Sequence, residues 1–256
     1  MASASDYVQR LMAQGRYHFT TQQAVAALGS SLARVRAELR QLKGEGDVVD
    51  PQRSFHVIVP PNRRACGCLY PEELVPPLMQ HLHEPYYVAL LSASERYGGH
   101  PHDHPFQVMA KVPRKPIECG EVHLQFLARK DLDRTPLLEE STPQGPLRVA
   151  SPEATALELV GYANQCGGLQ EISAVLADMV GALDPQKLIA VAPLAPIAWT
   201  QRLGYLLDAT DNRSLANVLV PTVQELAQHF APLVRARSKS GVKRLARWKL
   251  AVNASV

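Results

Sequence analysis

Residues 30–46, SSLARVRAELRQLKGEG, constrain the fold most strongly, because their pattern fits one kind of element. The apolar side chains are spaced 3, 4 and 3 residues apart, at Leu32, Val35, Leu39 and Leu42. This spacing places all four on one face of a helix. Ser30 or Ser31 can cap its start, and Gly44 and Gly46 can end it. The segment is therefore predicted to be a helix with one buried face and one exposed face.

Two shorter helices are predicted ahead of this segment. Ser3 or Ser5 can cap the first of them. Thr20 and Gln23 form a capping-box pattern in front of the second, QQAVAAL, which ends at Gly29.

Two β-rich runs, DVVD and SFHVIVP, follow the long helix and flank the turn Pro51-Gln52-Arg53. They predict a β-hairpin. Two helices, a tight turn, a third helix and a hairpin are the order of a winged helix-turn-helix. We therefore expect a winged helix-turn-helix DNA-binding domain over residues 1–64.

The exposed face of the predicted third helix is rich in groups that read DNA. A helix fits the major groove, where arginine makes bidentate contacts to guanine and serine or glutamine reaches base edges or phosphates. An arginine at a hairpin tip can contact the DNA backbone. The predicted DNA-binding residues are Ser31, Arg34, Arg36, Arg40 and Gln41 on the helix and Arg53 on the hairpin. The alternative for a small three-helix unit is a protein-interaction module that binds no DNA.

The formal net charge of +3 conceals an uneven distribution along the chain. Residues 1–64 hold 9 basic and 5 acidic residues, a net charge of +4, and residues 65–230 hold 11 and 19, a net charge of −8. Residues 231–256 hold 7 basic and no acidic residues, a net charge of +7. Two basic ends around an acidic middle are typical of a protein that binds polyanions. The alternative for the basic tail is a solvated segment that improves solubility.

Residues 65–256 are predicted to form a larger mixed α+β domain, mostly helical toward its end. Helical patterns cover residues 71–82, 86–97, 151–163, 167–180, 184–192, 195–209 and 215–230, and strand patterns cover residues 106–112, 121–129 and 147–149. The predicted fold class is α+β, with an N-terminal winged helix-turn-helix followed by this domain and its basic C-terminal tail.

HPHDH, residues 100–104, raises the question of a metal site. In an extended chain, its three histidines would share one face: His100, His102 and His104. The segment is one residue shorter than the H-x-H-x-D-H string that binds metal in metallo-β-lactamases. Gly98, Gly99 and Pro105 bracket it, which is the composition of a turn. We therefore expect a polar loop, and a metal-dependent hydrolase would rest on these histidines alone.

A second set of possible metal ligands fails on its spacing. The pairs Cys66-x-Cys68 and His81-x-His83 are both tighter than the spacings of zinc fingers. In a helix, two residues that are two positions apart also point about 200° away from each other. No nucleophile elbow, P-loop or dinucleotide-binding glycine motif occurs. We therefore predict no enzyme activity, no metal and no cofactor.

The four cysteines are few and irregularly spaced, so they imply no disulfide framework and favour a reducing compartment. The first 15 residues lack the apolar core of a signal peptide. No stretch approaches the roughly 20 apolar residues of a membrane span. A cytoplasmic protein with no membrane partner is expected.

Several stretches carry a family resemblance that covers nearly the whole chain. FTTQQAVAALGSSLARVRAELRQLKGEGDVV covers the winged helix, and ERYGGHPHDHPFQVMAKVPRKPIECGEVHLQFL opens the second domain. LRVASPEATALELV, GGLQEISAVLADM, RLGYLLD and RWKLAVN follow. In this order and spacing, the stretches resemble the AbiEi antitoxins of type IV toxin–antitoxin systems.

The resemblance implies a repressor whose winged helix binds inverted repeats upstream of its own operon. It implies a second domain that neutralises a toxin of nucleotidyltransferase fold, with or without direct contact. It also implies a positively charged antitoxin face, and here the matching charge lies mainly in the tail. The predicted antitoxin basic surface is therefore Arg235, Arg237, Lys243, Arg244, Arg247 and Lys249. The alternative is a winged-helix regulator whose second domain senses a ligand or mediates assembly.

Overall fold

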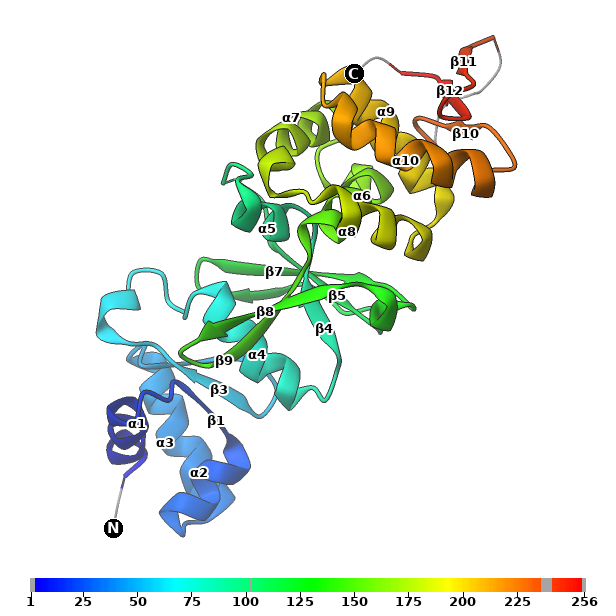
Figure 1. Cartoon of the computed structure of the whole chain (residues 1–256). Coiled ribbons are helices and arrows are strands. Elements are labelled where there is room, and N and C mark those ends of the chain that lie inside the picture. Colours follow the sequence, from blue (N-terminus) through cyan, green and yellow to red (C-terminus); the bar gives the residue numbers. More distant parts are fainter. Residues whose placement is uncertain (1–2, 102, 236–240, 255–256) are drawn as a thin grey trace. The chain divides into compact units, whose positions relative to one another are not determined.

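The computed structural model describes residues 3–101, 103–235 and 241–254, and the chain divides into two compact units (Figure 1). The first unit comprises Met1–Tyr87, His104–Leu132 and Glu139–Arg148. The second unit comprises Val88–Asp103, Asp133–Leu138 and Val149–Val256. Both contain helices and strands, as the predicted α+β class requires. The domain boundary at residue 64 stays a prediction.

The winged helix in the first unit has the predicted order of helices and hairpin. Its helices are α1 (Ala4–Ala13), α2 (Thr21–Leu28) and α3 (Leu32–Gly44), and its strands are β1 (His18–Thr20), β2 (Val48–Gln52) and β3 (Phe55–Ile58). The three strands form an antiparallel sheet in the order β1-β3-β2. The sequence pattern misses β1, because three residues are too few to show an alternation.

Side-chain caps fix where these helices begin, as the sequence predicts. Ser3 Oγ accepts a hydrogen bond from the backbone N–H of Asp6, whose carboxylate accepts one from the N–H of Ser3. Thr20 and Gln23 form the same reciprocal box at the start of α2. Ser31 caps α3. Each cap stabilises its helix by about 1 kcal/mol.

One face of α3 packs into the core of the winged helix. Val35, Leu39 and Leu42 are buried there with apolar side chains of α1, α2 and the sheet. Leu32, the first residue of α3, is 43% exposed, so the prediction that it belongs to the buried stripe is wrong. It lies at the free end of the helix, one turn ahead of the packed residues.

The hairpin turn lies slightly later than predicted. Gln52 pairs with Phe55, so Arg53 and Ser54 form the tip, and Ser54 has a φ of +61°. The strand register is irregular ahead of Gln52, which accommodates Pro51, because proline has no N–H to donate to a ladder. Arg53 therefore lies at the very tip of the wing.

A second sheet has six strands in the order β6-β7-β5-β4-β9-β8. The strands are β4 (Tyr86–Val88), β5 (Phe106–Ala110), β6 (Ile117–Cys119), β7 (Val122–Ala128), β8 (Leu137–Thr142) and β9 (Gly145–Ala150). The predicted strands correspond to β5, β7 and β9. The sequence pattern misses β6 and β8, and its helix prediction is wrong for Tyr86–Val88, since a short apolar run fits either element.

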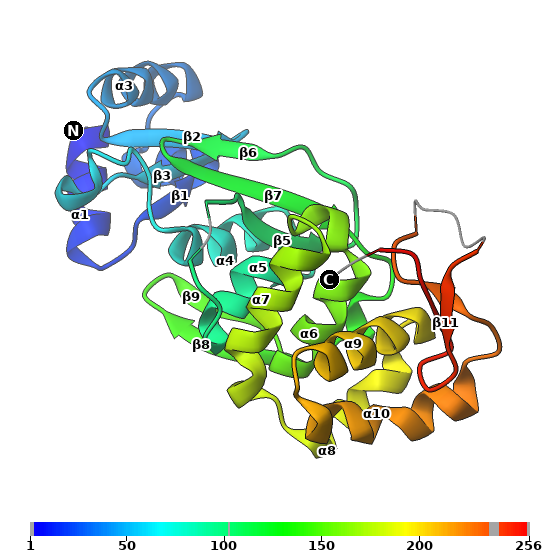
Figure 2. The ribbon, with the colours of Figure 1, turned by 90° about the horizontal axis from the view of Figure 1, so that it is seen from above.

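The remaining helices match the predicted segments. Helix α4 (Pro71–His81) belongs to the first unit, and the second unit contains α5 (Leu90–Ser94), α6 (Pro152–Gly161), α7 (Leu169–Met179), α8 (Pro185–Val191), α9 (Ile197–Ala209) and α10 (Arg213–Leu226). Short 3-10 helices lie at 61–63, 95–97, 132–134, 163–165, 180–182 and 192–194. Helix α9 packs against both α6 and α10 (Figure 2). Within the described residues, no helix combines the length and apolar character needed to cross a membrane.

The basic C-terminal segment is folded in its described part. Strands β10 (Ala231–Pro232), β11 (Lys243–Leu245) and β12 (Leu250–Val252) form a small sheet in the order β10-β12-β11. Trp248, between β11 and β12, is 1% exposed, and its ring lies directly over Gly204 of α9. The described part of the segment is thus built into the second unit instead of trailing from it.

Replacing Gly204 with alanine should destabilise the second unit. A Cβ at Gly204 would lie 2.1 Å from Cζ3 of Trp248, so the indole ring would have to move. Overpacking of this kind costs about 1–3 kcal/mol, which lowers the Tm by several degrees, about 2–4 °C per kcal/mol. The measurement is thermal melting by circular dichroism. The control is Gly181→Ala, since a Cβ at Gly181 would have no neighbour within 4 Å. Equal melting temperatures for both variants would contradict this packing.

Candidate nucleic-acid interface

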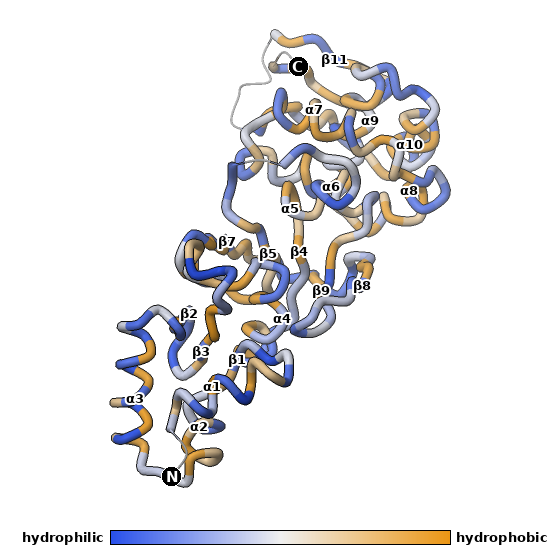
Figure 3. The backbone as a smooth tube through the Cα atoms, turned by 90° about the vertical axis from the view of Figure 1, so that its left-hand side faces the viewer, coloured by the Kyte–Doolittle hydropathy of each residue, from blue (hydrophilic) through white to orange (hydrophobic). Residues whose placement is uncertain are grey.

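The solvent face of α3 combines small residues with cations. At about 100° per residue, Ala33, Ala37 and Gly44 fall opposite the buried stripe. Two pairs of polar side chains flank them, with Arg36 and Arg40 on one side and Arg34 and Gln41 on the other. All four of these side chains are exposed. Figure 3 shows hydrophobic and hydrophilic residues alternating along the turns of α3. The exposed face of the helix is therefore a strip of small residues with at least one arginine on each side.

Contacts within α3 hold some of these side chains in place. Arg34 Nε donates to Glu38 Oε1 at 2.9 Å, and Gln41 Nε2 donates to Glu45 Oε1 at 3.0 Å. Hydrogen bonds from the N–H of Ala4 and from Arg34 keep the pKa of Glu38 below its ordinary value. Ser31 acts first as the N-cap, because its Oγ accepts from the N–H of Arg34. The Ser31 hydroxyl lies beside the positive end of the helix dipole.

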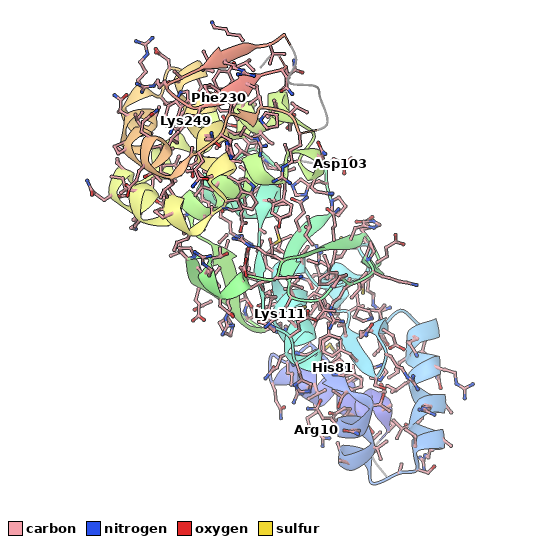
Figure 4. The ribbon with its side chains drawn as sticks, turned by 90° about the vertical axis from the view of Figure 1, so that its right-hand side faces the viewer. Arg10, His81, Asp103, Lys111, Phe230 and Lys249 are labelled. Atoms are coloured by element: carbon pink, nitrogen blue, oxygen red, sulfur yellow. The ribbon has the colours of Figure 1, made fainter. Side chains whose placement is uncertain are left out.

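The wing that carries Arg53 is held next to its tip by stacked rings. The Phe55 ring stacks with His18 and with His81 of α4, with centroids 6.0 and 5.1 Å apart. His81 Nε2 also lies 3.3 Å from the carbonyl oxygen of Arg53. Figure 4 labels His81 at this place. The exposed Arg53 side chain therefore extends from a fixed tip.

A polar network that the sequence does not reveal joins four elements of the winged helix. Thr21 Oγ1 lies 2.8 Å from His56 Nε2, and His56 Nδ1 lies 2.6 Å from Asp50 Oδ1. Lys43 Nζ donates to Asp50 Oδ2 at 2.6 Å. Thr21 and His56 are buried, which makes this a connection between α2, α3 and both hairpin strands. Burial alone would raise the pKa of Asp50, but hydrogen bonds from His56 and Lys43 hold it below its ordinary value.

The depressed pKa of Asp50 predicts an acid-sensitive winged helix. A carboxyl whose pKa is lowered by folding stabilises the fold above its unfolded pKa of about 4, and this stabilisation disappears as the pH falls through the folded value. Asp50→Asn should therefore lower the Tm by several degrees at pH 7 and by much less at pH 3. Circular dichroism melts at the two pH values measure this difference. An equal loss of Tm at pH 7 and at pH 3 would contradict the stabilising role of the Asp50 carboxylate.

The structure divides the predicted antitoxin basic surface into two groups. Arg235, Lys243 and Arg244 are exposed, and the Arg244 guanidinium lies 5.6 Å from the centroid of the Phe230 ring. Phe230 and Lys249 are labelled in Figure 4. Arg237 lies outside the described residues.

The second group, Arg247 and Lys249, is engaged within the protein. Arg247 donates to Asp208 Oδ2 at 2.9 Å and to Asn217 Oδ1 at 2.5 Å. Lys249 Nζ donates to the carbonyl oxygens of Gln224 and Ala227, at 3.1 and 2.6 Å, and so caps the C-terminal end of α10. These two cations attach the small C-terminal sheet to α9 and α10.

The described residues of the histidine segment, 100–101 and 103–104, lie in a loop, as predicted from the glycines and prolines. His100 Nδ1 lies 2.5 Å from Asp178 Oδ2 of α7, and His104 Nδ1 lies 2.7 Å from the carbonyl oxygen of Pro105. His102 lies outside the described residues. Across the part of the chain that the structure describes, no three His, Cys, Asp or Glu side chains gather as metal ligands could. His100 therefore fastens the loop to α7.

In the Cys66-x-Cys68 motif, the thiol of Cys68 contacts a cysteine that is distant in the sequence. Cys68 is buried, and its Sγ lies 2.6 Å from that of Cys119 in β6. No spacing rule could have found this pair, because the two residues are 51 positions apart.

Comparison with known proteins supplies a family for part of the chain. Residues 87–209 match the family model of the AbiEi antitoxin C-terminal domain. The crystal structure of the RV2827C protein from Mycobacterium tuberculosis is similar, with a TM-score of 0.67 and 17% sequence identity, over 96% of this chain and 90% of that chain. An antigenic nucleotidyltransferase-like protein from Paracoccidioides brasiliensis matches with a TM-score of 0.39 and 13% identity, over 58% of this chain and 89% of that chain. No curated protein matches the sequence.

The family match confirms the resemblance noted in the sequence, and the likeness to the RV2827C protein confirms the α+β fold. The matched family is one of antitoxins and not of enzymes. Its model begins at residue 87, after the winged helix, so the predicted DNA-binding residues lie outside the matched segment.

Proposed function

Because residues 87–209 belong to the AbiEi antitoxin C-terminal domain family, we propose that this chain is the antitoxin of a type IV toxin–antitoxin system and represses its own operon. The proposed partners are operator DNA with inverted repeats and a toxin of nucleotidyltransferase fold. The observation that carries the repressor half is the solvent face of α3, where small residues lie between two pairs of polar side chains.

This face has the shape and charge that the major groove of DNA accepts. Ala33 and Ala37 let the α3 backbone come close to the base edges, because no long side chain keeps it away. Arg36 and Arg40 are long enough to reach guanine O6 and N7 or the phosphates. Ser31 and the first turn of α3 suit a phosphate contact, as helix N-termini commonly do. Arg53 at the wing tip suits the flanking backbone.

A gel shift with the full-length protein tests the repressor half of the proposal. The probe is the DNA upstream of the gene that encodes the chain, compared with the same DNA carrying scrambled inverted repeats. We expect tight binding to the first probe only and an affinity that falls steeply with salt, because each phosphate contact releases counterions. Equal affinity for the two probes at physiological salt would contradict operator recognition.

A further inference from the structure

The second unit contains a cavity of about 630 Å³ beside the N-terminal end of α7. Its wall is formed by the last residues of α6, the turn that follows, the start of α7, Arg202 of α9, and residues 233–235. This volume lies within the range of small-molecule sites. The lining includes two arginines, Arg202 and Arg235, and no acidic residue among the described positions. The lining itself therefore carries two positive charges, and Glu171 packs against Gly167 at its edge.

Arg202 is an unusual residue to find in this wall. It is only 3% exposed, and its Nε donates to the carbonyl oxygen of Pro232 at 3.1 Å. Among the described residues, the charged side chain that acts on the pKa of Arg202 is another cation, Arg235. Burial, with a smaller contribution from Arg235, lowers the pKa of Arg202 to about 10, so the side chain keeps its charge at neutral pH. Buried cations are normally paired, because leaving water without a counter-charge is costly.

The lining also includes backbone groups at the start of α7. Gly167 and Gly168 have φ values of +75° and +95°, and Gly168 is the N-cap of α7. Because its N-cap is a glycine, this 11-residue helix has no side chain at the N-cap to accept a hydrogen bond from its first turn. Gly167, Gly168, Leu169 and Gln170 all line the cavity. The N–H of Gly168 donates to the carbonyl oxygen of Ala163 at 2.9 Å, and the dipole of the helix N-terminus favours an anion beside the first turn.

We propose that this cavity binds a small organic phosphate of nucleotide size, with its phosphate between the Arg202 guanidinium and the N-terminus of α7. Arginine matches phosphate because its planar fork donates two parallel hydrogen bonds. Exposed Arg235, on the cavity wall, adds a second cation. The rest of the cavity has room for the organic part of the ligand, next to the polar side chains of Asn164 and Gln165. This site is independent of the DNA-binding face and of the proposed toxin partner.

Isothermal titration of the full-length protein tests the site, with inorganic phosphate and ATP as separate probes and sodium chloride of equal ionic strength as the blank. We expect ATP to bind at least about tenfold more tightly than phosphate, and chloride to give no signal. Arg235→Ala should weaken ATP binding about tenfold, which corresponds to one charged hydrogen bond. The matched control is Arg213→Ala, because Arg213 is exposed on α10 and paired with Asp211. It should leave the affinity unchanged.

The Arg202→Met variant provides a second test, in which the Tm is measured with and without ATP. Because an uncompensated buried charge destabilises a fold, this variant should melt at the same temperature as the wild type or higher when no ligand is present. It should also lose the rise in Tm that ATP causes in the wild type. No binding of either probe to the wild type would overturn the proposal, and so would ATP binding that survives both substitutions. Equal affinities for phosphate and ATP would contradict the proposal that the cavity binds the organic part of the ligand.

Discussion

Alanine in place of Arg34, Arg36 and Arg40 should abolish operator binding in a gel shift at physiological salt. Charged hydrogen bonds contribute about 1.5–3 kcal/mol each, so the loss of three arginines predicts an affinity at least about 100-fold lower. The slope of log affinity against log salt should fall by about one for each arginine that contacts a phosphate. The fold should persist, because all three side chains are exposed, and the Arg34–Glu38 pair is an exposed ion pair worth at most about 1 kcal/mol.

The matched control for this triple variant is Arg10→Ala. Arg10 is exposed on α1 of the same winged helix, where its guanidinium lies 5.5 Å from the centroid of the Tyr7 ring. The Arg10→Ala variant loses a positive charge in the same unit but outside α3 and the wing. We expect its affinity for operator DNA to change by no more than about twofold. Unchanged operator affinity of the triple variant, with native circular dichroism, would exclude α3 as the recognition helix.

Neutralising Lys243 and Arg244 should abolish rescue from the toxin and leave operator binding intact. Both side chains are exposed on β11 in a segment with no acidic residue. If they contact an anionic group of the toxin or of its substrate, losing two charged contacts predicts an affinity at least about 100-fold lower. The measurement is growth of cells that express the toxin together with the Lys243→Gln/Arg244→Gln variant.

The control for this experiment is Arg247→Gln. Arg247 lies in the same basic segment, but its guanidinium is bound to Asp208 and Asn217. Its replacement should lower the Tm and leave rescue intact at temperatures where the protein is folded. Full rescue by the Lys243→Gln/Arg244→Gln variant would remove β11 from the antitoxin surface.

The winged helix was predictable because its signals are local. Ser3, the Thr20–Gln23 box and Ser31 each act within four residues, and each begins a helix where the sequence predicts. The turn of the hairpin was predicted less well, because Pro51 suggests a turn residue but is accommodated at a strand irregularity instead. Short strands without alternation, such as β1, depend on pairing with distant residues and leave no local signal.

In the candidate sites too, local features could be predicted and contacts between distant residues could not. Charge counts identify a basic segment, but they cannot tell the exposed Arg244 from Arg247, which pairs with a residue 39 positions earlier. Arg202 gave no signal in the sequence, because it lies in a helical pattern among apolar residues. Its place in a cavity wall is established only when α9 brings it beside residues from other parts of the second unit.

Growth of cells that co-express this chain with the proposed nucleotidyltransferase-fold toxin tests the central proposal most directly. The toxin alone should stop growth, and both the full-length chain and the Arg34→Ala/Arg36→Ala/Arg40→Ala variant should restore it, since antitoxin action would not require α3. Failure of the folded full-length chain to restore growth would contradict the antitoxin assignment.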